Sequence, residues 1–182
     1  ESVPKVRLLR LFMHNPGEHF AFREIVERTK IKPSTARSEL GKLMKINLIR
    51  EKKIAIKSQE QKTRHPRRTK GKEKQEKILV FMVNPEFGFL AELRDLVIKS
   101  SVASRKRLTR QVKMLGKVKL AVISGTFLNN DRSRTDLLIV GDDIGKRKVQ
   151  NFLSQLESEL GKSISYTLMD TDEFKYRMNM YD

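Results

Sequence analysis

The feature that most constrains this chain is a stretch of 21 residues, between Ile56 and Ile78, that contains no large apolar side chain. Its sequence is KSQEQKTRHPRRTKGKEKQEK. Such a segment cannot bury enough apolar surface to offset the entropy that is lost when it becomes ordered. We therefore expect residues 57–76 to form a flexible basic loop that contributes nothing to a hydrophobic core.

Two strand-like runs flank this loop. LIREKKIAI covers residues 48–56, and KILVFMV covers residues 77–83. Runs of this kind, rich in β-branched and aromatic residues, pair readily as a hairpin. A solvated linker is the alternative interpretation of any charge run, but the paired flanks favour a hairpin with a long basic tip.

The charge of the chain is concentrated at the same place. There are 39 Lys and Arg residues against 22 Asp and Glu residues, which gives a net charge of +17. Residues 50–77 alone carry a net +8, whereas residues 1–49 carry +5 and residues 78–182 carry +4. Such an excess predicts attraction to a polyanion, and nucleic acid is the first candidate.

The remaining composition excludes several classes of function. The 182 residues include no cysteine and only three histidines, so we expect neither a disulfide nor a thiolate or histidine metal site, and no cofactor. No apolar run approaches the roughly 20 residues of a membrane span. The first residues, with charges inside their apolar stretch, do not read as a signal peptide. We therefore expect a cytoplasmic protein that does not bind membranes.

Periodicity predicts an α+β chain that changes character near Asn84 and Pro85. We expect domains at residues 1–84 and 85–182. The predicted helices cover residues 3–13, 21–29, 34–46, 87–100, 103–115, 145–160 and 172–179. The predicted strands cover residues 48–56, 77–83, 118–124, 135–141 and 163–169.

The first half has the pattern of a small helical core followed by a hairpin. Val6, Leu9 and Phe12/Met13 define one apolar helix face, and Ile25 and Val26 define another. In the turn IKPS, Pro33 disfavours helix at Lys32, and Ser34 is placed to cap the next helix.

The helix that follows this turn has one apolar and one polar face. Its predicted buried stripe consists of Ala36, Leu40, Leu43 and Met44. Short, polar or cationic side chains then face outward, which suits the major groove of DNA. These outward residues are Thr35, Arg37, Ser38 and Lys42.

The segment IKPSTARSELGKLMKINLIREKK resembles the winged helix-turn-helix domains of transcription regulators, especially the ArsR-like type. The resemblance covers residues 4–84 and implies double-stranded DNA as the partner, with the third helix in the major groove. It also implies a homodimer, since such regulators generally bind two half-sites. The wing is long for the family. The residues that the resemblance assigns to DNA are Ser34, Thr35, Arg37, Ser38 and Lys42 of the helix, and Lys52, Lys53, Arg64, Arg67, Arg68 and Lys70 of the wing.

The second half contains KLAVISGTFLNNDRSRTDLLIVGDD, which resembles the minimal nucleotidyltransferase fold, a small α/β domain with a mixed sheet. In that family a strand ends in Gly-Ser, and the next strand carries an Asp-x-Asp pair that holds magnesium ions. Here Gly125 and Thr126 stand at the Gly-Ser position, and Asp136 has Arg134 and Leu138 at the two positions where its partner acid belongs. We expect Asp136 to pair with Arg134 rather than to bind metal.

The sequence thus predicts a DNA-binding transcription regulator, not an enzyme. Its second domain is expected to be a catalytically inactive nucleotidyltransferase-like module for scaffolding, dimerisation or sensing. Two alternatives stay open: an active nucleotidyltransferase that acts on protein or RNA, and a nonspecific nucleic-acid-binding protein. The identity of any nucleotide or small-molecule effector also stays open.

Overall fold

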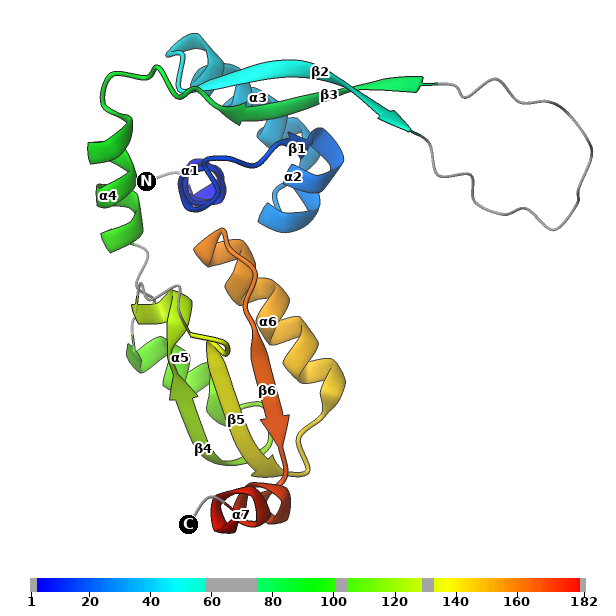
Figure 1. Ribbon diagram of the computed structural model, residues 1–182, viewed down its shortest axis with the longest axis vertical. Helices are drawn as coiled ribbons and strands as arrows, with labels where there is room; N and C mark the ends of the chain where they lie inside the picture. Colours follow the sequence, from blue (N-terminus) through cyan, green and yellow to red (C-terminus); the bar gives the residue numbers. More distant parts are fainter. Residues whose placement is uncertain (1–2, 58–74, 101–104, 129–132, 181–182) are drawn as a thin grey trace, which may run out of the picture.

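The computed structural model describes residues 3–57, 75–100, 105–128 and 133–180 (Figure 1). The fold is α+β. Within these ranges the chain forms seven α-helices, one short 3-10 helix and six strands, which are arranged in two separate three-stranded sheets. None of the helices in the described ranges has the length and apolar character that a bilayer span requires.

The first sheet is antiparallel and has the strand order β1-β3-β2. The predicted hairpin is present, with a regular register from Ile49 opposite Val83 to Lys57 opposite Gln75. Most of the predicted loop, residues 58–74, lies outside the described residues. The elements of this half are α1 (Val3–His14), β1 (Phe20–Ala21), α2 (Phe22–Thr29), α3 (Pro33–Lys45), β2 (Ile49–Lys57) and β3 (Gln75–Val83).

Strand β1 was not predicted, because a two-residue strand has no periodicity of its own. It exists through its pairing with β3, in which Phe20 stands opposite Phe81. This pairing also places the fully buried Phe20 ring edge-on against Phe12, with 5.8 Å between the ring centroids. Such an arrangement is the favoured geometry of an aromatic pair.

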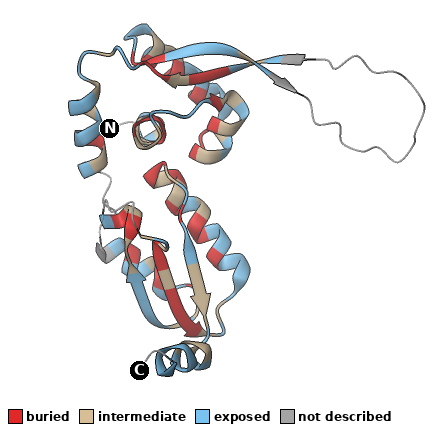
Figure 2. Ribbon diagram, in the orientation of Figure 1, coloured by how far each residue is buried: buried red, intermediate tan, exposed pale blue. Residues whose placement is uncertain are grey.

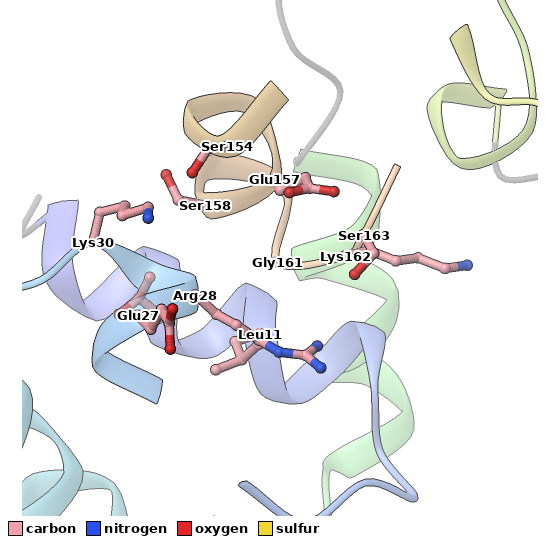
Figure 3. A pocket seen from close by; sticks show the side chains of 11 residues that line it. Leu11, Glu27, Arg28, Lys30, Ser154, Glu157, Ser158, Gly161, Lys162 and Ser163 are labelled. Carbon is pink, nitrogen blue, oxygen red and sulfur yellow. The ribbon is translucent and has the colours of Figure 1, made fainter. Parts of the chain in front are cut away.

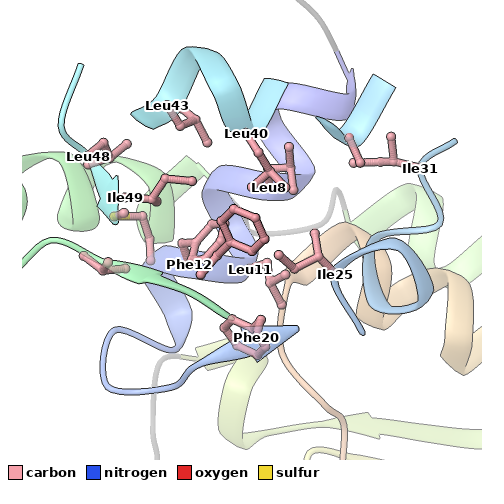
Figure 4. Packing of buried hydrophobic residues seen from close by; sticks show 14 of the residues in the cluster. Leu8, Leu11, Phe12, Phe20, Ile25, Ile31, Leu40, Leu43, Leu48 and Ile49 are labelled. Carbon is pink, nitrogen blue, oxygen red and sulfur yellow. The ribbon is translucent and has the colours of Figure 1, made fainter. Parts of the chain in front are cut away.

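The first core lies between α1, α2, α3 and the sheet (Figure 4). Helix α1 contributes Leu8, Leu11, Phe12 and Met13, which are all at most 1% exposed. The buried face of α1 therefore differs from the predicted face by part of a helical turn, because Val6 and Leu9 are only half-buried. The reason is that α1 has neighbours on several sides, so its buried surface is wider than one stripe.

Helix α3 begins one residue earlier than predicted. Lys32 has extended backbone angles at the N-cap position, and Pro33 is the first helical residue, where its missing N–H costs no hydrogen bond. Ser34 is therefore already inside the helix and does not cap it. On the buried side Ala36, Leu40 and Leu43 agree with the prediction, whereas Met44 is half-buried and Glu39 is buried instead.

The second sheet is mixed and has the order β4-β5-β6, with β4 antiparallel and β6 parallel to β5. The central strand β5 is buried, whereas β4 is largely exposed (Figure 2). Leu137 and Ile139 of β5 pack with α5 and α6 in a second core. The elements are α4 (Leu90–Ser100), α5 (Arg105–Lys113), β4 (Lys117–Ile123), the 3-10 helix η1 (Gly125–Leu128), β5 (Leu137–Asp142), α6 (Lys146–Leu160), β6 (Tyr166–Met169) and α7 (Thr171–Asn179).

Helix α4 packs on the first core, although the predicted boundary near residue 84 assigns it to the second domain. Val97 is buried in the first cluster, with Leu90 and Leu93 beside it. Arg94 Nε also donates to the carbonyl oxygen of Met13 at 3.1 Å. The two hydrophobic clusters thus separate between Val97 and Leu108, after α4 rather than before it.

The two halves meet where the C-terminal end of α6 lies against α1. Arg10 Nη1 donates to the carbonyl of Glu159 at 2.8 Å, and Asn15 Nδ2 donates to the carbonyl of Gly161 at 2.8 Å. Gly161 ends α6 in the left-handed conformation (φ 77°), and a Cβ there would overlap the backbone of Arg10 and Leu11. Beside this contact, α1, α2 and the end of α6 enclose a cavity of about 220 Å³ (Figure 3).

Gly161→Ala is expected to lower the melting temperature markedly. The left-handed backbone costs a residue with a Cβ about 1–2 kcal/mol, and the overlap with α1 adds to that cost. Differential scanning calorimetry measures the effect. Gly41→Ala is the matched control, since that glycine lies within α3 and a Cβ there would meet nothing within 4 Å. The control should be neutral or stabilising, and equal melting temperatures for both variants would contradict the packing described.

Candidate nucleic-acid interface

One side of α3 faces solvent and carries polar and cationic groups. Ser34, Ser38 and Lys42 are exposed and, at intervals of four residues, lie on one helix face. Arg37 is exposed beside them, and Thr35 is half-buried. The structure thus brings all five of the helix residues that were predicted to bind DNA to one side of α3 or its margin.

Two of these side chains have partners within the protein. The Arg37 guanidinium lies over the Phe22 ring, 5.0 Å from its centroid. Among the described residues no carboxylate lies within ion-pair distance of Arg37, so its charge is available to a ligand. Lys42 Nζ instead lies 2.6 Å from Oε1 of Glu39, whose side chain is 9% exposed. Of the five helix residues, Arg37 thus has a guanidinium that is held in orientation and that no carboxylate of the described ranges neutralises.

The hairpin adds cations next to this helix. Lys52 and Lys53 are exposed on β2 and, as successive strand residues, point to opposite faces of the hairpin. The other predicted wing residues, Arg64, Arg67, Arg68 and Lys70, lie outside the described residues.

Two further lysines belong to this surface and were not predicted. Lys32 and Lys45 are exposed at the two ends of α3. Lys45 follows Ser38 and Lys42 at intervals of seven and three residues, so helical spacing could have placed it on the same face. Lys32 precedes the helix, so helical spacing gave no signal for it.

The residues on which the nucleotidyltransferase resemblance was based, Gly125, Thr126 and Asp136, contact one another in the second half. Asp136 is buried, and its two carboxylate oxygens accept hydrogen bonds from the backbone N–H groups of Thr126 (2.6 Å) and Ser165 (2.8 Å). Gly125 adopts a positive φ of 50°, and a Cβ at this position would overlap the Asp136 carboxylate. Gly125, Thr126 and Asp136 therefore come together as predicted by their spacing, but their observed contacts are with one another and with Ser165.

The expected ion pair between Arg134 and Asp136 is not formed. Arg134 is exposed, and no ion pair joins it to Asp136 in the described part of the chain. The prediction assumed that both residues lie on one strand, where residues two apart share a face. Strand β5 begins only at Leu137, so this alternation does not apply to residues 133–136.

The remaining carboxylates of this sheet lie at its opposite end. Asp142 is six residues from Asp136 along the chain, which corresponds to about 20 Å along an extended strand. It contacts Lys119 Nζ at 2.7 Å and Thr171 Oγ1 at 2.8 Å, and these contacts lower its pKa to about 2. Asp143 accepts a hydrogen bond from Lys117 at 2.7 Å, which raises the pKa of that lysine. No cluster of three metal-binding side chains occurs among the described residues.

Comparison with known proteins adds no further assignment. No family model, no curated protein and no solved structure matches this chain.

Asp136→Ala is expected to lower the free energy of unfolding by about 3 kcal/mol, because two backbone N–H groups lose a charged acceptor. Urea denaturation measures the difference. Asp143→Ala is the matched control, since Asp143 is exposed and its ion pair with Lys117 is a surface pair worth at most about 1 kcal/mol. Similar losses of unfolding free energy in the two variants would show that the hydrogen bonds of Asp136 do not stabilise the fold.

Proposed function

We propose that this protein is a sequence-specific DNA-binding transcription regulator whose first half is a winged helix-turn-helix. The observation that carries the proposal is the exposed polar and cationic face of α3 beside a basic antiparallel hairpin. The element order α1-β1-α2-α3-β2-β3 and the sheet order β1-β3-β2 support it, because they place the third helix and the hairpin next to each other.

In this mechanism α3 lies in the major groove. Ser34, Ser38 and Arg37 contact base edges, with Arg37 held in orientation by the Phe22 ring. An arginine that is fixed in this way is suited to a bidentate contact with guanine. The hairpin lysines and the basic segment between the strands neutralise phosphates, which supplies affinity without sequence preference. A homodimer would place two such helices on two half-sites.

The second half is proposed to be a nucleotidyltransferase-like domain without catalysis. Transfer of a nucleotide requires several carboxylates around hard cations. Asp136 is a single acid, and both of its oxygens already accept backbone hydrogen bonds. An active transferase is therefore the weaker alternative. Metal-dependent triphosphate binding in titration calorimetry, lost in Asp136→Ala, would support it instead.

Selection of bound fragments from random duplex DNA tests the proposal, and a recurring sequence motif is the expected result. Arg37→Ala should relax the preference at one base position at a cost of about 1–3 kcal/mol. Arg147→Ala, on the exposed side of α6, is the control for loss of one positive charge. Equal affinity for unrelated duplexes would contradict sequence-specific binding and favour the nonspecific alternative.

We expect the wing to contribute to DNA affinity through its positive charge alone. Replacing Arg64, Arg67, Arg68 and Lys70 with alanine should weaken binding to every duplex and flatten the salt dependence of affinity, because fewer counterions are released. Affinity measured between 50 and roughly 200 mM salt tests this expectation. An unchanged slope would show that these residues do not contact phosphates.

A further inference from the structure

Strand β4 forms one edge of the second sheet and, within the described ranges, pairs only with β5 (Figure 1). Its first half carries features that usually protect an edge strand, namely Lys117, Lys119 and a shift of register between Val118 and Leu120. Its second half, residues 120–123, has the sequence LAVI, without charge or proline. Three of these four residues are exposed. An apolar edge of this kind is prone to pair with another strand.

The register determines which backbone groups of this edge are available. The Leu137 N–H donates to the residue before β6 at 3.2 Å. Because successive strand residues direct their backbone groups to opposite sides, those of Leu138 are directed to β4, where Val122 stands opposite. Ala121 and Ile123 therefore direct their N–H and C=O groups to the free edge.

An apolar groove of about 320 Å³ lies between this edge and α5. Ala121 and Ile123 line it from the strand, and Val112 and Lys113 line it from the helix. A strand added along β4 would direct alternate side chains to this groove, because cross-strand neighbours share a face of the sheet. The edge thus offers both backbone partners and side-chain space to an extended segment.

The charge beside the groove is positive. Five of the nine residues of α5 are Lys or Arg, and none is acidic. Arg107 is paired with a carboxylate of α6, and Lys119 with one of β5. Arg110 and Lys113 are exposed, and no carboxylate in the described part of the chain lies within ion-pair distance of either. A segment with carboxylates next to its apolar residues complements this edge.

We propose that the edge of β4 binds an extended acidic peptide segment of another protein, which adds antiparallel to β4 as a fourth strand. Antiparallel pairing is the more stable arrangement. Main-chain hydrogen bonds supply affinity, and the groove selects apolar side chains at alternate positions. A carboxylate beside them pairs with Lys113. The proposal is independent of DNA binding, because this edge contains none of the residues assigned to DNA.

Two other occupants fit this edge less well. Antiparallel pairing with β4 of a second copy would place both α5 helices on the same face of one continuous sheet, where their unpaired cations repel each other. Duplex DNA would neutralise these cations, but it has no peptide groups to pair with Ala121 and Ile123.

Titration calorimetry tests the proposal with the full chain and a short synthetic peptide in which glutamate, valine, isoleucine and glutamate alternate with threonine. The alternation places carboxylates and apolar side chains on one face. This peptide should bind, and its counterpart with lysine in place of glutamate should bind about tenfold more weakly. N-methylation of the valine and isoleucine removes the N–H groups directed to β4 and should abolish binding, whereas N-methylation of the threonines should be tolerated. Equal affinity for these peptides, or binding of none, would overturn the proposal.

Hydrogen exchange gives a readout for single residues. The peptide should slow exchange of the Ala121 and Ile123 N–H groups, whereas Val122, already bonded within the sheet, should change little. Lys113→Gln should weaken binding about fivefold, the value of one surface ion pair. Lys148→Gln, on the exposed side of α6, is the matched control and should leave binding unchanged. Equal weakening in both variants would contradict the proposal, as would unchanged exchange at residues 121 and 123.

A third variant, Ala121→Phe, fills the groove from the strand and should reduce peptide affinity. Because Ala121 is exposed, its melting temperature should stay close to that of the unaltered chain. Analytical ultracentrifugation identifies the other occupants. A dimer that Ala121→Phe dissociates, without peptide binding, would assign the edge to a second copy. Loss of duplex affinity in Lys113→Gln, without peptide binding, would assign it to DNA, and either result would overturn the proposal.

Discussion

The arrangement of the two halves depends on how the carbonyl groups at the end of α6 are satisfied. The last carbonyls of any helix have no partner within that helix. Here the carbonyls of Glu159 and Gly161 accept hydrogen bonds from Arg10 and Asn15 of α1. The end of a helix in the second half is thus completed by side chains of the first. A glycine is required at the contact because a Cβ would occupy the space of the α1 backbone.

Helix α1 consequently has a central position in the chain. It packs against α2, α3 and α4 in the first core and against α6 at the junction. The exposed face of α3 therefore rests on a helix whose other side holds the second half.

Sequence patterns predicted the local structure well and the long-range contacts poorly. Every α-helix and every strand of the described residues was expected within a few positions, except β1, which exists only because Phe20 meets Phe81. The outward orientation of Arg37 and Ser38 follows from helical spacing alone. The sequence indicated only that Gly161 ends a helix. The need for a glycine comes from its contact with α1, about 150 residues earlier, which no local pattern shows. The hydrogen bond from Arg10 to the carbonyl of Glu159 was equally hidden, since these residues meet only through packing of the two halves.

The motif around Asp136 illustrates how similar residues can support different chemistry. In a metal site, a carboxylate oxygen must be free to coordinate a cation. In this protein Asp136 accepts hydrogen bonds from Thr126 at the start of η1 and from Ser165 just before β6. It thereby holds together the starts of η1, β5 and β6. Each oxygen of Asp136 accepts one of these backbone bonds in a buried environment, where an unpaired N–H is costly. Under the proposal that this half is without catalysis, the role of Asp136 is to stabilise this end of the sheet.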